Sequence, residues 1–459
     1  MIDVVVIGGG IAGLYTAYRY LKRHPGKRLI VLEKSLRELG GRVQTYHDAV
    51  MDVEIGAGRI NQSHRLVMGL IRDLGLGKHL VSIGHENAFM STKRPGHKIH
   101  SLSDIVSSAK LSALGIVPKK RSEMPFDELI AKLVRESRKR SKRQLQSMTF
   151  LEYAEEVIGD ALVRVIIDTF GYYSEIVIMN AYDSLQLMRE LDPSNRFYGM
   201  KGGLSQIIDR LASEIRNMGG TIVLGQHVVD IRKLEPPVAA VKRSGGARKT
   251  RKLGCPGSPS GFQIRCKDGA VYWAKKCVCA LPKQAIQRLE GGMFDKVLPS
   301  LAKIECGTLC RIYAQFDKGT NGKVWFHDLG KLTVDNDLRM IIPIDLERGI
   351  VMISYSDNQW ADKWNDLYKK EGIGAVNRRL RDLVSEVVGV RIPLPKHTHV
   401  FYWPCGVGYW SKGADSLAIE RRVVEPSPGL FVCGEHYSSG HQQWIEGALR
   451  TSQHVLSRL

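Results

Sequence analysis

Apolar runs lie near both ends of the chain and alternate there with helical patterns. Residues 4–7 form one apolar run and residues 29–32 form a second. Between them, from about Ile11, apolar residues recur at the spacing of a buried helix. This order predicts a β-α-β unit with parallel strands. A third apolar run at 430–433 precedes a helical pattern from about residue 444, so we expect the two ends of the chain to close one domain.

The middle of the chain changes from helical to strand patterns. Residues 63–191 show helical spacing, for example at 66–76 and 150–158, with few strand signals. Later strand patterns lie at residues 221–224, 228–231, 262–266, 277–281, 311–316, 340–344 and 351–355. Together these patterns predict an α/β fold that carries a largely helical insertion and a further strand-rich insertion.

The length and composition are those of a globular protein with more than one domain. The chain has 459 residues, of which 43% are hydrophobic and 25% are charged, and this is enough for two or three packed domains. No basic segment with a cleavable apolar stretch precedes the first strand, and no apolar run is long enough to span a bilayer. We therefore expect a soluble, intracellular protein.

Positive charge is in excess, and part of it lies in two short runs. The 67 Lys and Arg residues outnumber the 47 Asp and Glu residues, which gives a net charge of +20. Residues 135–143 are expected to continue an amphipathic helix from Asp127. Residues 242–252 lie in a Gly-, Pro- and Ser-rich stretch, 236–261, that we expect to be a basic flexible insertion. Such runs are most often solvated surface; the alternative is non-specific contact with nucleic acid or another polyanion, because no aromatic residues are interleaved for base stacking.

The eight cysteines give no sign of a metal or redox motif. None stands in a C-x-x-C pair. Cys277 and Cys279 share a face of one strand, and Cys306 and Cys310 would share a face only of a helix, so neither pair is a persuasive disulfide. We expect buried thiols and no metal site.

A glycine-rich turn after the first strand indicates a dinucleotide site. Gly8, Gly10 and Gly13 form the pattern G-x-G-x-x-G between the first strand and the first helix. Without side chains, this turn lets backbone N–H groups and the positive end of the helix approach a pyrophosphate. Glu33, followed by Lys34, closes the second strand about twenty residues later, where its carboxylate would bind a ribose and repel a 2′-phosphate. The alternative is a purely structural glycine turn.

Further motifs extend this pattern over most of the chain. They are Gly40-Gly41-Arg42, residues 200–203, Trp403, Gly434-Glu435 and residues 444–448. With the glycine-rich turn and Glu33, they resemble the flavin-containing amine oxidase superfamily, which includes monoamine, polyamine and L-amino-acid oxidases. The resemblance implies an FAD cofactor, hydride removal from a carbon that bears an amine, and reoxidation by oxygen to hydrogen peroxide.

The resemblance also implies a domain organisation. It implies a GR2-type, Rossmann-like FAD-binding domain of discontinuous segments, which we expect at residues 1–62, 196–292 and 397–459. An inserted α+β substrate domain would take its largely helical part from residues 63–195 and its sheet from residues 293–396.

Within the superfamily, the chain is most similar to the L-amino-acid oxidases. Arg59 matches the arginine that grips the substrate carboxylate, a role that suits its planar, two-pronged guanidinium group. Tyr355 matches the tyrosine that shares this carboxylate, and Trp444 matches the tryptophan that walls the site above the flavin. Tyr409 corresponds to an aromatic-cage position of the amine-oxidising branch. The alternatives are that Arg59 pairs with a phosphate or a nearby carboxylate, and that Tyr355 and Trp444 serve core packing alone.

The same resemblance assigns further cofactor contacts. Arg42 would lie at the pyrophosphate or the ribityl chain, and Val228 would hold the adenine through its backbone. Glu435 would bind the ribityl hydroxyls. The full set of implied cofactor contacts comprises Gly8, Gly10, Gly13, Glu33, Lys34, Gly41, Arg42, Gly58, Arg59, Val228, Trp403, Gly434, Glu435, Trp444 and Ile445. Gly408 stands where some relatives carry a flavin-linking cysteine, so we expect noncovalent FAD.

One catalytic position departs from the family pattern. The family commonly places a lysine, linked through water to flavin N5, where this sequence has Arg311. An arginine stays protonated and cannot accept a proton as a lysine can, although it can orient a water or stabilise negative charge on the reduced flavin. Arg311 and Trp444 are the expected catalytic residues.

These observations favour an FAD-dependent oxidase that converts an L-amino acid to a 2-oxo acid, ammonia and hydrogen peroxide. One alternative is oxidation of a primary amine or polyamine, which offers Arg59 no carboxylate. The other is a flavoprotein scaffold with weak or no turnover whose basic surface binds a polyanion, as Arg311 and the charge of +20 suggest.

Overall fold

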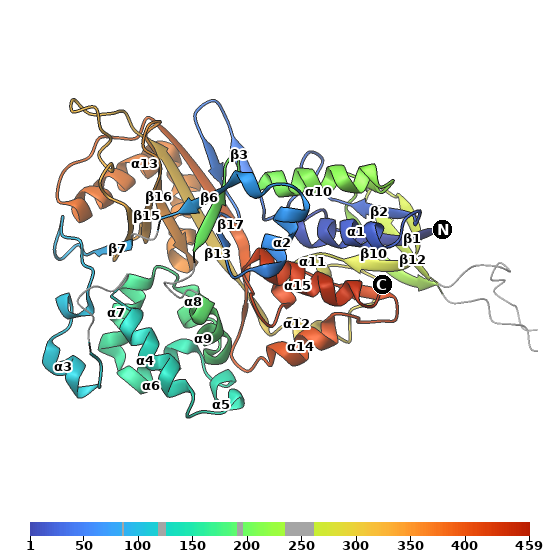
Figure 1. Cartoon of the computed structure of the whole chain (residues 1–459), viewed down its shortest axis with the longest axis horizontal. Helices are drawn as coiled ribbons and strands as arrows, with labels where there is room; N and C mark the ends of the chain where they lie inside the picture. Colours follow the sequence, from blue (N-terminus) through green and yellow to red (C-terminus); the bar gives the residue numbers. More distant parts are fainter. Residues whose placement is uncertain (85–86, 118–124, 191–195, 235–260) are drawn as a thin grey trace, which may run out of the picture.

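The computed structural model describes residues 1–84, 87–117, 125–190, 196–234 and 261–459. One sheet, which takes strands from the first and the last part of the chain, lies at one end of the molecule (Figure 1). A second sheet and a cluster of helices lie at the other end. The basic run 242–252 lies outside the described residues.

The first sheet joins the beginning and the end of the chain. Its strands run in the order β10, β11, β12, β1, β2, β9, and β18 pairs with β12. They span β1 (Ile2–Ile7), β2 (Leu29–Leu32), β9 (Thr221–Val223), β10 (Val228–Leu234), β11 (Gly261–Cys266), β12 (Val271–Cys279) and β18 (Leu430–Val432). The pairs that involve β1, β2, β9 and β18 are parallel. Because β12 lies between β1 and β18, the two chain ends complete one sheet, as the sequence predicts.

Helices cover this sheet and bury it on both faces. Val4 and Val6 of β1 face one apolar core, while Val5 and Ile7 face another, which is the continuous apolar pattern of a buried parallel strand. The first core is shared by α1 (Ile11–Arg23), α2 (Arg65–Asp73), α10 (Ser205–Asn217) and α15 (Ile445–Leu456). Helix α2 therefore packs with the first sheet, although it lies in the segment 63–195.

The second sheet has the order β17, β13, β16, β15, β14, β7. Its strands are β7 (Asn87–Met90), β13 (Ile304–Gln315), β14 (Lys331–Val334), β15 (Met340–Asp345), β16 (Ile350–Asp357) and β17 (His397–Trp410). Helix α13 (Asn358–Val388) packs across β13, β16 and β17 and buries Trp364 and Leu380 in their common core. The helix is interrupted at Gly372, which has a φ of 74°.

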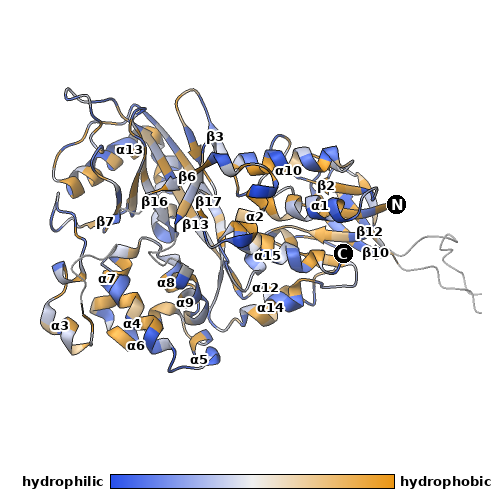
Figure 2. Cartoon of the chain, viewed as in Figure 1, coloured by the Kyte–Doolittle hydropathy of each residue, from blue (hydrophilic) through white to orange (hydrophobic). Residues whose placement is uncertain are grey.

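A helical cluster packs beside the second sheet (Figure 1). It contains α3 (Ser108–Ala113), α4 (Asp127–Ser137), α5 (Lys142–Gln146), α6 (Phe150–Ile158), α7 (Asp160–Phe170), α8 (Ser174–Val177) and α9 (Ala181–Glu190). Helices α6 and α7 carry hydrophobic and hydrophilic residues in alternation (Figure 2), and their apolar sides meet in one core. The side chain of Thr149 caps α6 by accepting the backbone N–H of Glu152, which explains where this helix begins.

The segment 63–191 carries mostly helices and two short strands. Strand β7 joins the second sheet, and β6 (Leu80–Ile83) joins β5 (Ile60–Asn61) and β8 (Phe197–Met200) in a three-stranded sheet. One expectation is corrected: residues 135–143 do not continue one helix from Asp127. Helix α4 ends at Ser137, and Ser141 caps the separate helix α5 by accepting the backbone N–H of Gln144.

The first basic run forms ion pairs with neighbouring acidic residues. Lys139 pairs with Glu136 at 2.6 Å, and Arg140 pairs with Glu156 at 2.7 Å. Lys142 pairs at 3.0 Å with Asp415, the residue that precedes α14 (Ser416–Val423). Much of the charge of this run is therefore balanced within the fold, and nothing in the described part of it favours a polyanion partner.

Short elements complete the fold. They are β3 (Thr45–His47), β4 (Asp52–Glu54), α11 (Lys283–Gln287), α12 (Leu298–Leu301) and the 3-10 turns at Gly77–His79, Leu102–Asp104 and Glu435–Tyr437. Among the residues that the structure describes, no helix combines the length and the apolar character needed to cross a membrane.

Candidate functional site

The glycine-rich turn leaves one open position above the first helix. A Cβ added to Gly8, whose φ is 104°, would lie 2.5 Å from the carbonyl oxygen of Ala280, and one added to Gly13 would lie 2.0 Å from that of Gly8. At Gly10, by contrast, the nearest heavy atom would be 3.7 Å away. Gly10 is also the N-cap of α1, and it has no side chain that could bond to the first N–H groups of the helix. These features fit the pyrophosphate of a dinucleotide.

Glu33 lies beside the turn in a fixed orientation. One carboxylate oxygen accepts the backbone N–H of Gly9 at 2.7 Å, and the other accepts that of Ser35 at 2.8 Å. A carboxylate offers about four acceptor sites, so these bonds leave capacity for ribose hydroxyls. The adjacent Lys34 is exposed.

Arg42 and Glu435 form an ion pair between the two ends of the chain. Arg42 also donates to the carbonyl oxygen of Gly406 at 3.2 Å, and Glu435 accepts the backbone N–H of Gln443 at 2.9 Å. Burial alone would raise the pKa of Glu435, but the charge of Arg42 and a hydrogen bond with His436 lower it to about 2. The Glu435 side chain is therefore a carboxylate at ordinary pH, held where the resemblance expects ribityl hydroxyls.

Arg59 is enclosed by aromatic rings. Its guanidinium carbon lies 4.7 Å from the ring centre of Phe197, 5.3 Å from that of Trp444 and 5.9 Å from that of Tyr172. It also donates to the Tyr172 hydroxyl at 3.3 Å. Within the described part of the chain no carboxylate forms an ion pair with Arg59, so the alternative of a nearby carboxylate partner is not supported there. The site thus presents a cation to an incoming anion.

Arg311 holds the segment that carries Arg59. Its guanidinium group donates to the carbonyl oxygen of Glu54 at 2.7 Å, and the Tyr313 hydroxyl donates to the same oxygen at 2.6 Å. Trp403 donates to the carbonyl oxygen of Ile55 at 2.6 Å. A Cβ on Gly58 would lie 3.2 Å from Arg311, which shows how closely the segment approaches this side chain. Arg311 therefore fixes the backbone of this segment.

Tyr355 joins the two arginines. Its ring lies 4.6 Å from the guanidinium carbon of Arg311 and meets the ring of Tyr172 edge-on at 5.7 Å. Since Tyr172 contacts Arg59, the four side chains form one continuous group. This group combines β13, β16 and the loop after α7 with the segment before β5.

Trp444 lies at a strained part of the backbone. Four described residues other than glycine have a positive φ, and His441 and Gln443 are two of them. They stand just before Trp444, which in turn precedes Ile445, the first residue of α15. Strained backbone conformations persist only where the surrounding structure holds them in place, and they are concentrated at functional sites.

The remaining predicted residues occupy separate places. Tyr409 is buried with Met179 and Leu187, and Trp444 packs against this group. Val228 is buried at the start of β10. Gly434 has a φ of 143° and leads from β18 into Glu435, while Gly41 precedes Arg42 in the turn beside Gly10.

Sequence reasoning missed three residues of the site. Tyr172 and Phe197 line the Arg59 cage but stand in segments without any motif. Lys331 begins β14, where burial lowers the pKa of its ammonium group to about 7 and the positive charge of Arg59 acts in the same direction. Only the tertiary fold brings this lysine within electrostatic range of Arg59.

The titration of Lys331 predicts proton uptake on ligand binding. A carboxylate bound at Arg59 adds negative charge, which raises the pKa of Lys331. We expect benzoate binding above pH 7 to take up a proton, whereas below pH 7 Lys331 is already protonated and the uptake fades. Calorimetry in buffers of different ionisation enthalpy measures this uptake. It should vanish in Lys331→Met and persist in the surface control Lys110→Met; equal uptake in both variants would contradict the prediction.

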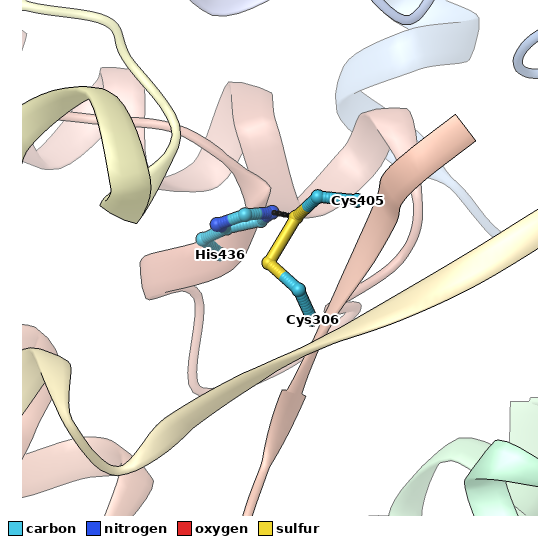
Figure 3. Close-up of side chains that lie close together, drawn as sticks. All are labelled: Cys306, Cys405 and His436. Atoms are coloured by element: carbon cyan, nitrogen blue, oxygen red, sulfur yellow. Dashed lines mark hydrogen bonds between the residues drawn. A yellow bond between two sulfur atoms is a disulfide. The ribbon is translucent and has the colours of Figure 1, made fainter. Parts of the chain in front are cut away.

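The expectation that the cysteines are all thiols is wrong. Cys306 and Cys405 form a disulfide, with Cα atoms 5.0 Å apart (Figure 3). They are 99 residues apart in sequence, and only the pairing of β13 with β17 brings them together. The five other described cysteines are free and buried.

Comparisons with known proteins agree with this architecture. A model of the family described as flavin containing amine oxidoreductase matches residues 11–455. An L-amino-acid oxidase of Gloydius halys is 30% identical over 98% of this chain and 87% of its own length. An uncharacterized protein of Acanthamoeba polyphaga mimivirus is 22% identical over 99% of this chain and 93% of its own. A putative protoporphyrinogen oxidase from Exiguobacterium sp. 255-15 shares the fold, with a TM-score of 0.68 and 17% identity over 99% of this chain and 98% of that chain.

The first sheet, completed by strands from both ends of the chain, and the second sheet beside a helical cluster make up the fold that this chain shares with that solved structure. The family match covers nearly the whole chain, so the chain belongs to the flavin-containing amine oxidoreductase family. The predicted fold class and the predicted resemblance are thereby confirmed.

Proposed function

We propose that this protein is an FAD-dependent oxidase of an L-amino acid, and that it forms a 2-oxo acid, ammonia and hydrogen peroxide. The observation that carries this proposal is Arg59, a cation enclosed by three aromatic rings. The planar guanidinium group is suited to bind a carboxylate through two parallel hydrogen bonds. An amine without a carboxylate would leave this charge without a partner. The L-amino-acid oxidases among the relatives support the same substrate class.

The cofactor in this proposal is noncovalent FAD. The N-terminus of α1 at Gly10 would hold the pyrophosphate, Glu33 the adenosine ribose, Val228 the adenine, and the Arg42–Glu435 pair the ribityl region. FAD, when bound, supplies the hydride acceptor and the centre at which oxygen is reduced. Two observations support noncovalent binding: the Cys405 sulfur is already joined to Cys306, and a Cβ on Gly408 would lie 2.9 Å from the His436 ring.

The chain's own residues would orient the substrate. Arg59 would bind the carboxylate and Tyr355 would share it, while Trp444 and Tyr409 would close the aromatic side of the site. Arg311, fixed to the carbonyl of Glu54, would keep Arg59 in place. Orientation of the substrate α-carbon towards the acceptor is the main contribution that a protein makes to such a transfer.

An anaerobic absorbance titration tests this proposal. The purified holoprotein is mixed with the common L-amino acids, their D-forms, simple amines and polyamines in turn. Bleaching of the bound-flavin spectrum by L-amino acids alone would support the proposal. Bleaching by amines or polyamines alone would replace it with an amine oxidase.

A flavin spectrum that no candidate bleaches would direct attention to Arg311. We then expect Arg311→Lys to restore bleaching by an L-amino acid, because a lysine can exchange a proton near the acceptor and an arginine cannot. The control is Lys303→Arg, which makes the reverse change at an exposed position before β13. If the flavin bound to Arg311→Lys is still not bleached by any L-amino acid, the result would favour a flavoprotein scaffold.

A further inference from the structure

The Cys306–Cys405 disulfide spans an irregularity in the second sheet. The register of β13 and β17 passes from Gly307 opposite Val407 to Leu309 opposite Trp403. Residues 404–406 therefore lie opposite Thr308 alone and form a bulge, where the ladder of backbone hydrogen bonds is interrupted. The disulfide ties this bulge to β13 in place of the missing ladder.

The bulge is connected to the proposed cofactor site by a closed set of contacts. The carbonyl oxygen of Gly406, the residue after Cys405, accepts a hydrogen bond from Arg42, and Arg42 pairs with Glu435. Glu435 contacts the neighbouring His436 at 3.1 Å. The ring of His436 returns to the disulfide, with Nε2 3.8 Å from the Cys405 sulfur (Figure 3). A movement of Cys405 would therefore reach the Arg42–Glu435 pair through both Gly406 and His436.

We propose that the Cys306–Cys405 disulfide is a reversible redox site that a dithiol reduces by thiol–disulfide exchange, and that reduction of this disulfide lowers the affinity of the chain for flavin. The second part rests on the proposed function, because it assumes that Arg42 and Glu435 bind FAD. Both cysteines are half-buried, whereas the five free cysteines that the structure describes are buried, so this pair is the more exposed target for such a reductant.

The exchange is balanced without any further reactant. A thiolate of the dithiol attacks one sulfur, and the Cys306–Cys405 bond breaks as a mixed disulfide forms. The second thiolate of the reductant then attacks the mixed disulfide, and the reductant leaves as a cyclic disulfide. Two electrons and two protons pass to the cysteines, which become thiols. The side-chain amide of Gln284 donates towards both sulfurs, at 3.1 Å from that of Cys405, and would stabilise the thiolate that leaves.

The alternative occupant of the reduced site is a metal ion, since two cysteines and a histidine are zinc ligands. The hydrogen bonds of His436 oppose it. The backbone N–H of Lys283 donates to Nδ1 at 3.2 Å, so in the neutral ring the proton is on Nε2, which faces the Glu435 carboxylate. Burial lowers the pKa of His436 and so favours this neutral ring. Nε2, the atom nearest the sulfurs, therefore has no free lone pair for a metal.

The first measurement tests whether the disulfide can be reduced in the folded protein. The folded holoprotein is treated with dithiothreitol, alkylated and digested, and the masses of the peptides that contain Cys306 and Cys405 are measured by mass spectrometry. We expect both to be alkylated only after reduction, while Cys310, buried on the same strand, stays unmodified. Resistance of the pair to dithiothreitol in the folded protein would overturn the proposal, as would stoichiometric Zn²⁺ in the reduced protein.

The second measurement compares the FAD affinity of the oxidised and the reduced protein. We expect reduction to weaken FAD affinity about tenfold, the effect of losing one charge-assisted hydrogen bond, as measured by the fluorescence of released FAD. Cys405→Ser should behave as the reduced protein does and ignore dithiothreitol, whereas the control Cys310→Ala should respond as the wild type. If reduction leaves FAD affinity unchanged, the redox proposal would be overturned but the proposed function would not. Absence of FAD from the oxidised protein as well would overturn the proposed function.

Discussion

Arg59→Met will lower kcat/KM for an L-amino acid by about 10²- to 10³-fold while most of the flavin stays bound. The expected size is that of removing one partner from a desolvated, hydrogen-bonded charge pair. The arginine is enclosed by Phe197, Trp444 and Tyr172, so water screens its charge poorly and its interaction with a carboxylate is strong. Methionine fills a similar volume and keeps the contact with the rings.

Three comparisons make the Arg59 result specific. Arg59→Lys keeps the charge but loses the two-pronged geometry, so we expect an intermediate loss. Arg210→Met changes an exposed arginine on α10 that pairs with Glu214, and it should leave turnover unchanged. Any residual activity of Arg59→Met should shift in favour of amines that lack a carboxylate. An equal loss for amino acids and amines would show that Arg59 supports the fold or the flavin instead.

The parts of the fold that follow from local sequence are those with short-range causes. The glycine-rich turn, α1 and the strand before Glu33 are adjacent in the chain, and their spacing alone fixes their arrangement. The cap of α6 at Thr149 is equally local. The break between α4 and α5 was also visible as Ser141 followed by Gln144, a capping-box pattern, but the helical spacing of Leu129 and Leu133 suggested one continuous helix.

The parts that could not be predicted depend on contacts between distant segments. Tyr172 and Lys331 carry no motif, and they come near Arg59 only because the helical cluster and the second sheet face the nucleotide-binding part. The Cys306–Cys405 disulfide requires the register of β13 against β17, which no local pattern encodes. Arg311 shows the same limit: its position was identified by resemblance, but its hydrogen bond to the Glu54 carbonyl required the structure.

Gly10→Ala will separate flavin binding from folding. Gly10 has a φ of −76° and a ψ of 176°, a backbone conformation open to alanine, and the nearest atom to an added Cβ is 3.7 Å away. The apoprotein should therefore unfold at the wild-type temperature. If the pyrophosphate lies against this turn, the methyl group occupies its space, and FAD affinity should fall about 10- to 100-fold, as overpacking costs of 1–3 kcal/mol imply.

Two other glycines provide the contrast for Gly10→Ala. Gly69→Ala adds a Cβ on α2 that meets no atom within 4 Å, so both stability and FAD affinity should be kept. Gly13→Ala places its Cβ 2.0 Å from the Gly8 carbonyl oxygen, so it should destabilise the apoprotein itself. Fluorescence titration of each apoprotein with FAD, together with its thermal unfolding, measures both effects. Wild-type FAD affinity in Gly10→Ala would mean that the pyrophosphate does not lie at the N-terminus of α1, and the cofactor site would have to be placed elsewhere on the sheet.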